Sequence, residues 1–236
     1  MLSRAELIER YGIPDRSVPR VRVNFISSLD GAATLGGVSG GLNNADDKLV
    51  FDTLRLLSDV LLVGAGTVRI EGYGGIRLDD DAVAWRVGHG LPPQPTVAVV
   101  SARLELPPTH PVFLDPATRP IVVTHAAAPR DRREELSAVA DVLVCGMTMV
   151  DVGLLPAALA ERGLPQILCE GGPGLLGSFL AADRVDEYCL TLSPVLEGGV
   201  SGRVARGAVQ VARRMTLLHA FASGDMLFLR YGRDSS

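Results

Sequence analysis

The chain is nearly devoid of lysine: of its 23 basic residues only Lys48 is a lysine, and the rest are arginines. No five like charges occur in a row, and 27 acidic residues bring the net charge to -4. Affinity for nucleic-acid phosphates needs clustered cations. This charge pattern therefore argues against a nucleic-acid partner.

Cysteine, histidine and long apolar runs are also scarce. Cys145, Cys169 and Cys189 are odd in number and widely spaced, which fits neither a disulfide framework nor a zinc clip. The four histidines share no ligand spacing with each other or with a cysteine, so no metal site is expected. No apolar stretch reaches the ~18 residues of a membrane span, and the N-terminus lacks a signal-peptide core. We therefore expect a cytoplasmic protein with no membrane partner.

Short apolar runs separated by turn residues dominate what is present. Strands are expected at 21–27, 60–64, 96–101, 121–125, 141–146, 166–170, 188–196 and 225–232. Most of these runs are apolar at consecutive positions, which is typical of strands covered on both faces. Helices are expected at 44–58, 130–138, 151–162 and 173–182. The alternation predicts an α/β fold with a mostly parallel central sheet flanked by helices.

The remaining segments define the expected organisation of the chain. Residues 1–236 are expected to form a single domain, with a helical extension at 1–19 and a core at about 20–231. The C-terminal strands follow one another without a helix, which predicts an antiparallel edge or hairpin. Residues 74–95, rich in glycine and proline, are expected to be a surface excursion. Asn43 and Asn44 are the expected N-cap of the helix at 44–58, and Asp46 and Asp47 suit the dipole of its first turn.

Two glycine-bearing turns each follow an apolar strand and precede a helix. They are GAGT at 64–67 and EGGPG at 170–174. Glycine allows a ligand to approach the backbone, and free N–H groups at a helix start attract phosphate oxygens. Either turn alone could be a plain connection, but the pair with an acidic residue favours a bound nucleotide. The G-x-G-x-x-G fingerprint of the common dinucleotide unit is absent.

A glycine-rich stretch at 27–44 follows the first expected strand and contains Asp30. It is either a mobile loop that closes over a site or an ordinary surface loop. Asp30 is correspondingly either a site residue or a turn residue beside Gly31.

Three segments together resemble the pyrimidine reductase of riboflavin biosynthesis, a domain found alone or fused behind a deaminase. They are SSLDG at 27–31, DTLRLLSDVLLVGAGTV at 52–68, and LCEGGPGLLGSFLAADRVDEYCLTLSPVLEGG at 168–199. The resemblance implies a dihydrofolate-reductase-like fold, a homodimer and NADPH as hydride donor. The H-x-E and P-C-x-x-C motifs of zinc deaminases do not occur in these 236 residues, so no deaminase domain is expected in them.

The resemblance and the glycine turns together define the expected site. Expected cofactor-binding residues are Gly64, Gly66, Thr67, Glu71, Ser101, Gly171, Gly172, Pro173, Gly174, Leu175, Leu176, Gly177 and Ser178. Expected substrate-binding residues are Ser39, Arg55, Arg77 and Glu170. Arg55 is the expected phosphate ligand, because its planar fork matches a phosphate. Glu170 and, less directly, Asp30 are the expected catalytic residues, with Glu170 assisting proton delivery.

The implied reaction passes a hydride from NADPH to C1′ of 5-amino-6-(5-phosphoribosylamino)uracil or a close pyrimidine analogue. Two positions depart from the family pattern: Ala32 replaces the lysine of SLDGK, and the segment 39–43 has no tryptophan. These departures keep two alternatives open. One is a related reductase of dihydrofolate or another pterin, and the other is an NADPH-binding protein without turnover.

Overall fold

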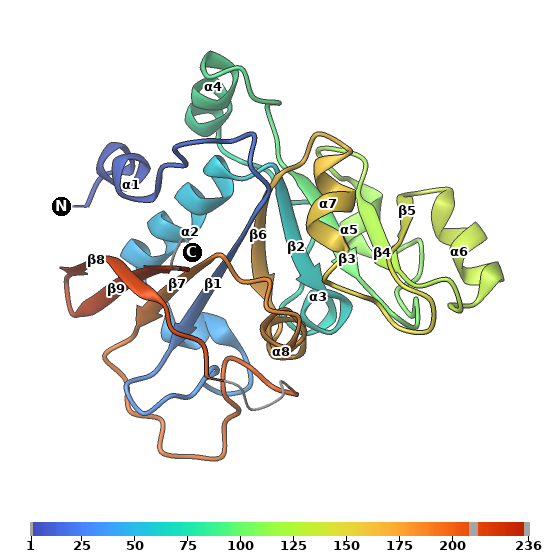
Figure 1. The fold of residues 1–236 in the computed structure, drawn as a ribbon. Helices are drawn as coiled ribbons and strands as arrows, with labels where there is room; N and C mark the ends of the chain where they lie inside the picture. Colours follow the sequence, from blue (N-terminus) through green and yellow to red (C-terminus); the bar gives the residue numbers. More distant parts are fainter. Residues whose placement is uncertain (1, 208–211, 234–236) are drawn as a thin grey trace.

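A nine-stranded sheet with strand order β5-β4-β3-β2-β6-β1-β7-β9-β8 forms the centre of the computed structural model, which describes residues 2–207 and 212–233 (Figure 1). The strands are β1 (Arg20–Ser27), β2 (Val60–Gly64), β3 (Thr96–Val100), β4 (Ile121–Thr124), β5 (Asp141–Val144), β6 (Gln166–Gly171), β7 (Glu187–Leu192), β8 (Thr216–Ser223) and β9 (Met226–Gly232). Strands β1 to β7 run parallel, while β9 pairs antiparallel with both β7 and β8. The predicted parallel sheet with antiparallel C-terminal strands is confirmed.

Helices cover both faces of this sheet. They are α1 (Arg4–Tyr11), α2 (Ala45–Leu57), α3 (Ala65–Ile70), α4 (Asp80–Gly88), α5 (Pro111–Leu114), α6 (Arg130–Ser137), α7 (Leu155–Ala160) and α8 (Pro173–Ala181), with a 3-10 turn η1 (Ser39–Leu42). On β2, Leu62 packs in the cluster that contains α7 and α8, whereas Leu61 packs with α1 and α2 on the other face. Each such buried leucine contributes roughly 1.5–3 kcal/mol. Burial on both faces explains why the strands are apolar at consecutive positions.

Helix α4 corrects the expectation that residues 74–95 are only a surface excursion. Asp79 caps its start by accepting a hydrogen bond from the backbone of Ala82 at 2.8 Å. Arg86 is fully buried and donates to the backbone carbonyls of Leu56 and Ser58 at 2.8 and 2.6 Å. The guanidinium thus satisfies carbonyls at the C-terminal end of α2, so that this arginine belongs to the packed interior.

Two element boundaries and one further strand also differ from the sequence prediction. The seventh helix begins at Leu155 because Asp151 accepts a hydrogen bond from the amide of Gly153 and closes a turn before it. Strand β7 ends at Leu192, four residues before the expected end. Strand β8 was not predicted, because its side chains are mostly exposed and its apolar pattern is broken by His219. Within the described residues, no helix combines the length and apolarity needed to cross a membrane.

Candidate active site

The main cavity lies between α2, the start of α8 and the strands β1 and β6. Its volume is about 520 Å³, within the range of small-molecule sites. The lining residues include Asn24, Phe25, Ile26, Ser39, Asp47, Phe51, Arg55, Thr67, Glu71, Tyr73, Arg77, Glu170, Gly172 and Pro173. Its position at one end of parallel strands is where open α/β sheets bind ligands.

Arg55 of α2 and Glu170 of β6 form a two-contact ion pair in the wall of this cavity. Arg55 Nε and Nη2 donate to the two carboxylate oxygens of Glu170 at 2.7 and 2.8 Å, and the Tyr73 hydroxyl donates to Glu170 Oε2 at 2.9 Å. The Glu170 side chain is 1% exposed and that of Arg55 15%. The arginine also stacks on Phe51, with 4.1 Å from its Cζ to the ring centre.

Electrostatics fix the charge states of the two groups that face Glu170. Burial lowers the pKa of Arg55, but the adjacent Glu170 carboxylate outweighs it and leaves that pKa raised. Burial, together with the charge of Glu170, raises the pKa of Tyr73 well above its usual range. Arg55 therefore stays cationic and Tyr73 stays neutral across the physiological pH range. The wall presents a compensated ion pair and a phenol hydroxyl to any ligand.

The two glycine turns predicted to bind a nucleotide lie against each other. A Cβ added to Gly64 would meet the backbone N of Gly172 at 3.5 Å, and one added to Gly172 would lie 2.4 Å from Thr67 Oγ1. Gly172 is the N-cap of α8, where no side chain satisfies the first amides and Pro173 occupies the first turn. At this corner Gly172 leaves no room for a side chain, whereas Gly64 makes ordinary contacts, and the start of α8 leaves backbone N–H groups available to an anion.

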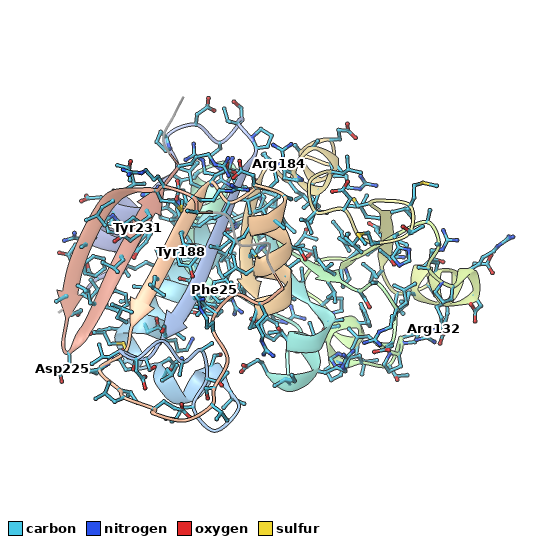
Figure 2. The ribbon with its side chains drawn as sticks, turned by 60° about the horizontal axis from the view of Figure 1, so that its bottom comes forward. Phe25, Arg132, Arg184, Tyr188, Asp225 and Tyr231 are labelled. Carbon is cyan, nitrogen blue, oxygen red and sulfur yellow. The ribbon has the colours of Figure 1, made fainter. Side chains whose placement is uncertain are left out.

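Phe25 packs against the corner on the face of the sheet that α8 covers. A Cβ on Gly171 would meet the Phe25 ring at 3.5 Å. Phe25 also stacks on Tyr188 of the neighbouring strand, with 6.4 Å between ring centres, and both lie beside α8 (Figure 2). This aromatic pair supports the end of β6 and the start of α8.

A second cavity of about 490 Å³ lies on the other side of the corner. Its lining includes the expected cofactor residues Gly64, Gly66, Ser101, Gly174, Leu175 and Ser178. It also contains Arg69 and Arg103, which flank Glu105 at 3.6 and 3.1 Å and are largely exposed. Weak surface pairs of this kind leave both guanidinium groups free to reach an anionic ligand.

The other expected cofactor residues lie in two places, the main cavity and the hydrophobic core. Thr67, Glu71, Gly172 and Pro173 line the main cavity. Leu176 and Gly177 are buried on the sheet side of α8, and Leu176 belongs to the core cluster. Neither residue lines either cavity, so the expectation that both contact the cofactor stays a prediction without support from their placement. The reason is helical geometry: successive residues of α8 turn by about 100°, so a continuous segment cannot face one ligand.

Comparisons with known proteins show the family of this chain. Residues 19–229 match the model of the RibD C-terminal domain. The chain belongs to the RibD C-terminal domain family. It is 30% identical over 182 residues to the 2,5-diamino-6-ribosylamino-4(3H)-pyrimidinone 5′-phosphate reductase of Archaeoglobus fulgidus, covering 77% of this chain and 83% of that protein. The enzyme of the same name from Methanothermobacter thermautotrophicus is 29% identical over 218 residues, covering 90% and 97%.

A solved structure shares the whole fold of this RibD C-terminal domain. The crystal structure of a pyrimidine reductase-like protein from Corynebacterium diphtheriae superimposes with a TM-score of 0.85 at 26% identity. The superposition covers 98% of each chain. The predicted family and its fold are thereby confirmed.

Within this family fold, the other expected substrate residues lie at the mouth of the main cavity. The Ser39 amide donates to Glu71 Oε1 at 3.1 Å, so the loop at 27–44 is tied to α3 rather than free at this point. Arg77 Nη2 contacts Asp115 Oδ1 at 2.7 Å, and both side chains are more than half exposed. An exposed pair of this kind opens at little cost. Arg77 is therefore available to a substrate phosphate, whereas two nitrogens of Arg55 are already engaged by Glu170.

Asp30 does not line either cavity in the described part of the chain, and its expected catalytic role stays a prediction. Its carboxylate accepts hydrogen bonds from the amides of Glu197 and Gly198 at 3.2 and 2.7 Å and from the Ser28 hydroxyl. These bonds, led by that from Ser28, lower its pKa to about 2. Asp30 holds two loops together, and its acceptor positions are used by the protein itself.

Asp47 and Asn24 are lining residues that the sequence interpretation did not select. The sequence placed Asp46 and Asp47 together as carboxylates that suit the helix dipole. In the structure Asp46 accepts a hydrogen bond from the Ser223 hydroxyl at 2.7 Å, while Asp47 faces the main cavity. A helical wheel anchored on the apolar residues Val50, Leu54 and Leu57 places Asp47 on their side, and this was the available signal.

Proposed function

We propose that this chain is a pyrimidine reductase of riboflavin biosynthesis that transfers a hydride from NADPH to C1′ of a ribosylaminopyrimidine 5′-phosphate. The proposal rests on one observation: the two cavities adjoin at the corner that Gly64, Thr67 and Gly172 form. The second cavity would hold a pyridine dinucleotide, and the main cavity would hold the hydride acceptor next to it. The names of the two archaeal relatives support this substrate class.

The residues of the second cavity fit a pyridine dinucleotide. Positions for a Cβ on Gly66 and Gly174 are open, so a ligand can approach the backbone of both turns. The uncapped start of α8 offers N–H groups to a pyrophosphate. Arg69 and Arg103 add positive charge that suits the additional 2′-phosphate of NADPH. This charge is the basis for proposing NADPH rather than NADH.

The bound coenzyme supplies the hydride, and the protein supplies position and charge. The C1′–O4′ bond of the ribose first opens, with the proton of the amino nitrogen passing to O4′, which leaves a C1′=N imine. The hydride then adds to C1′, and the imine nitrogen takes up one proton. Both oxygens of Glu170 accept hydrogen bonds from Arg55, so this carboxylate has no proton to donate in the arrangement observed. We therefore assign Glu170 the task of orienting Arg55 and Tyr73, with water as the proton source. Arg77 is the proposed phosphate ligand.

The decisive experiment measures NADPH oxidation by the purified chain with a ribosylaminopyrimidine 5′-phosphate and, separately, with dihydrofolate. We expect oxidation with the pyrimidine and none with dihydrofolate. Activity with dihydrofolate alone would support the pterin reductase, and coenzyme binding without any oxidation would support the binding protein. Either result overturns the proposal.

The same assay, run with NADPH and with NADH, tests whether the second cavity binds the coenzyme. We expect Arg103→Ala to raise the KM for NADPH about tenfold and to leave that for NADH unchanged, since only NADPH carries the 2′-phosphate. Arg130→Ala on α6, whose exposed guanidinium binds Glu134, is the matched control and should change neither value. The implied homodimer and the cytoplasmic location stay predictions.

A further inference from the structure

Tyr73 is a residue of the main cavity that the sequence interpretation did not select. It lies in the turn that follows α3, where Gly72, with a φ of +68°, reverses the chain just before it. The Tyr73 amide donates to the Val68 carbonyl at 3.1 Å, and its ring packs against the core cluster that contains Val68. Its hydroxyl donates to Glu170 Oε2 at 2.9 Å. Backbone, ring and hydroxyl are all held, so the phenol has one defined position in the cavity wall.

The direction of the hydroxyl hydrogen bond decides what the phenol can recognise. Its proton points to Glu170, whose side chain is 1% exposed and also accepts two hydrogen bonds from Arg55. Burial and the charge of Glu170 raise the pKa of Tyr73, so the phenol keeps that proton. Arg55 faces the same oxygen. The Tyr73 oxygen therefore offers a ligand only a lone pair, which accepts a hydrogen bond from one further donor.

Such an oxygen binds a charged donor more strongly than a neutral one. An acceptor whose own proton is held by a carboxylate is polarised, and hydrogen bonds in a chain strengthen one another at low dielectric. Hydrogen bonds in which one partner is ionised are roughly twice as strong as neutral ones. The Arg55 and Glu170 charges compensate each other, so the wall adds no net charge that would repel a cationic donor.

The proposed reaction brings one such donor to this part of the cavity. C1′ has to lie where the two cavities adjoin in order to meet the coenzyme, and Glu170 lies two residues before Gly172 of that corner. The atom bonded to C1′ is the nitrogen that joins it to the pyrimidine. As a neutral imine, this nitrogen presents a lone pair that the Tyr73 oxygen repels. As a protonated imine, it presents an N–H group and a positive charge, which suit that oxygen.

We propose that Tyr73 is a catalytic residue whose oxygen accepts a hydrogen bond from the protonated nitrogen at C1′. The imine nitrogen takes its proton from water before the hydride arrives. The hydride then adds to C1′, and the electron pair of the C1′=N π bond moves onto nitrogen, which leaves a neutral amine. Tyr73 keeps its own proton throughout. This inference rests on the proposed reductase function and adds a residue to its mechanism.

Binding measurements test the proposed contact without turnover. The ribitylamino product keeps the N–H group next to C1′, whereas a ribityloxy counterpart carries an ether oxygen there. We expect the unmodified chain to bind the product at least about tenfold more tightly, because the ether oxygen would face a lone pair of Tyr73 in a buried wall. In Tyr73→Phe, which keeps the ring and removes the acceptor, this preference should be lost. Titration calorimetry measures the Kd values.

Single-turnover oxidation of NADPH tests the catalytic role. We expect the rate in Tyr73→Phe to fall about 30-fold and the KM for the pyrimidine to change only about threefold, since the hydrogen bond is stronger with the protonated imine than with the neutral substrate. The matched control is Tyr231→Phe on β9, because Tyr231 lines neither cavity in the part of the chain that the structure describes (Figure 2). It should change neither the rate nor the binding preference.

The outcomes separate the two proposals. Equal binding of the product and its ether counterpart by the unmodified chain overturns the role of Tyr73 and leaves the reductase function standing, whether or not Tyr73→Phe folds. An unchanged rate in Tyr73→Phe does the same. So does a slower Tyr73→Phe that retains the binding preference, because the rate would then depend on packing and not on the contact. If no pyrimidine is reduced, the proposed function and the inference built on it both fail.

Discussion

Arg55 and Glu170 lie 115 residues apart in the chain, and the fold joins them in one wall of the main cavity. Each was expected from the sequence to meet the substrate on its own. Their mutual ion pair changes the interpretation, since two nitrogens of the arginine and both oxygens of the carboxylate are already engaged. At the scale of single residues, the pair is a positioning device that keeps Tyr73 and Arg55 in place.

Replacing one partner of this pair tests that interpretation. We expect Glu170→Gln to lower kcat/KM at least tenfold and to destabilise the fold by about 3 kcal/mol, because Arg55 is left buried without its counter-ion. Steady-state kinetics and urea unfolding measure the two effects. Glu134→Gln, in the exposed pair with Arg130, is the control and should change stability by less than about 1 kcal/mol. Equal effects of the two variants would contradict the positioning role.

The elements that matter most are α3 and α8, because their starting turns meet at one corner. The strands β2 and β6 end side by side in the sheet, which brings Gly64 next to Gly172. Neither turn alone makes a nucleotide site. Their contact through Thr67 joins the two cavities that the proposed reaction needs.

A methyl group at this corner should disturb both elements. Gly172→Ala places a Cβ 2.4 Å from Thr67 Oγ1, and the β-branched threonine in a helix has little freedom to move away. We expect a loss of about 1–3 kcal/mol in unfolding free energy and an increase of about tenfold in the Kd for NADPH. Gly88→Ala in α4 has open space around the added Cβ and should leave both values essentially unchanged. Binding of NADPH by Gly172→Ala with unaltered Kd would show that the corner does not contact the coenzyme.

On the scale of the whole molecule, a buried ion cluster joins the parallel part of the sheet to its antiparallel edge. Glu187 of β7 accepts hydrogen bonds from Arg20 and Arg22 of β1 at 2.8 Å each and from Arg230 of β9 at 2.9 Å. Its side chain is 1% exposed. Burial alone would raise its pKa, but Arg22 and Arg230 outweigh burial and lower it to about 2.

Acid should therefore destabilise the fold through this cluster. The unfolded chain takes up a proton on Glu187 near its ordinary pKa of about 4.5, whereas the folded chain does so only near pH 2. The stabilisation of about 3 kcal/mol is present above pH 4.5 and is lost as the pH falls towards 2. Burial lowers the pKa of His219 on β8 to about 4, so a further loss sets in as the pH falls below about 6.5.

Urea unfolding at a series of pH values between 7 and 2 measures this dependence. In Glu187→Gln the fall in stability below pH 4.5 should be much shallower, although the variant is less stable at neutral pH. In His219→Gln the loss between pH 6.5 and 4 should be reduced, and the loss at lower pH should remain. An unchanged profile in Glu187→Gln would contradict the role of the cluster.

The sequence by itself determined the architecture and the position of the corner. Consecutive apolar residues such as those of β4 are required when both faces of a strand are covered, so they identify the parallel sheet. The glycines at 64 and 172 are likewise a local signal, because they follow apolar strands and precede helices, and at Gly172 an added Cβ would lie only 2.4 Å from Thr67 Oγ1. The apolar strands and the glycines do not specify a reaction. The resemblance of the segments at 27–31, 52–68 and 168–199 to the reductase family indicated it.

Only the tertiary structure decided which polar residues serve the site. Asp46 and Asp47 are neighbours in the first turn of α2, and only the packing of that helix shows that Asp46 binds Ser223 while Asp47 lines the cavity. Asp30 accepts hydrogen bonds from loop amides, and the buried Arg86 donates to carbonyls at the end of α2, which their places in the sequence do not indicate. Hydrogen bonding and burial depend on partners distant in the chain, and a single sequence does not name those partners.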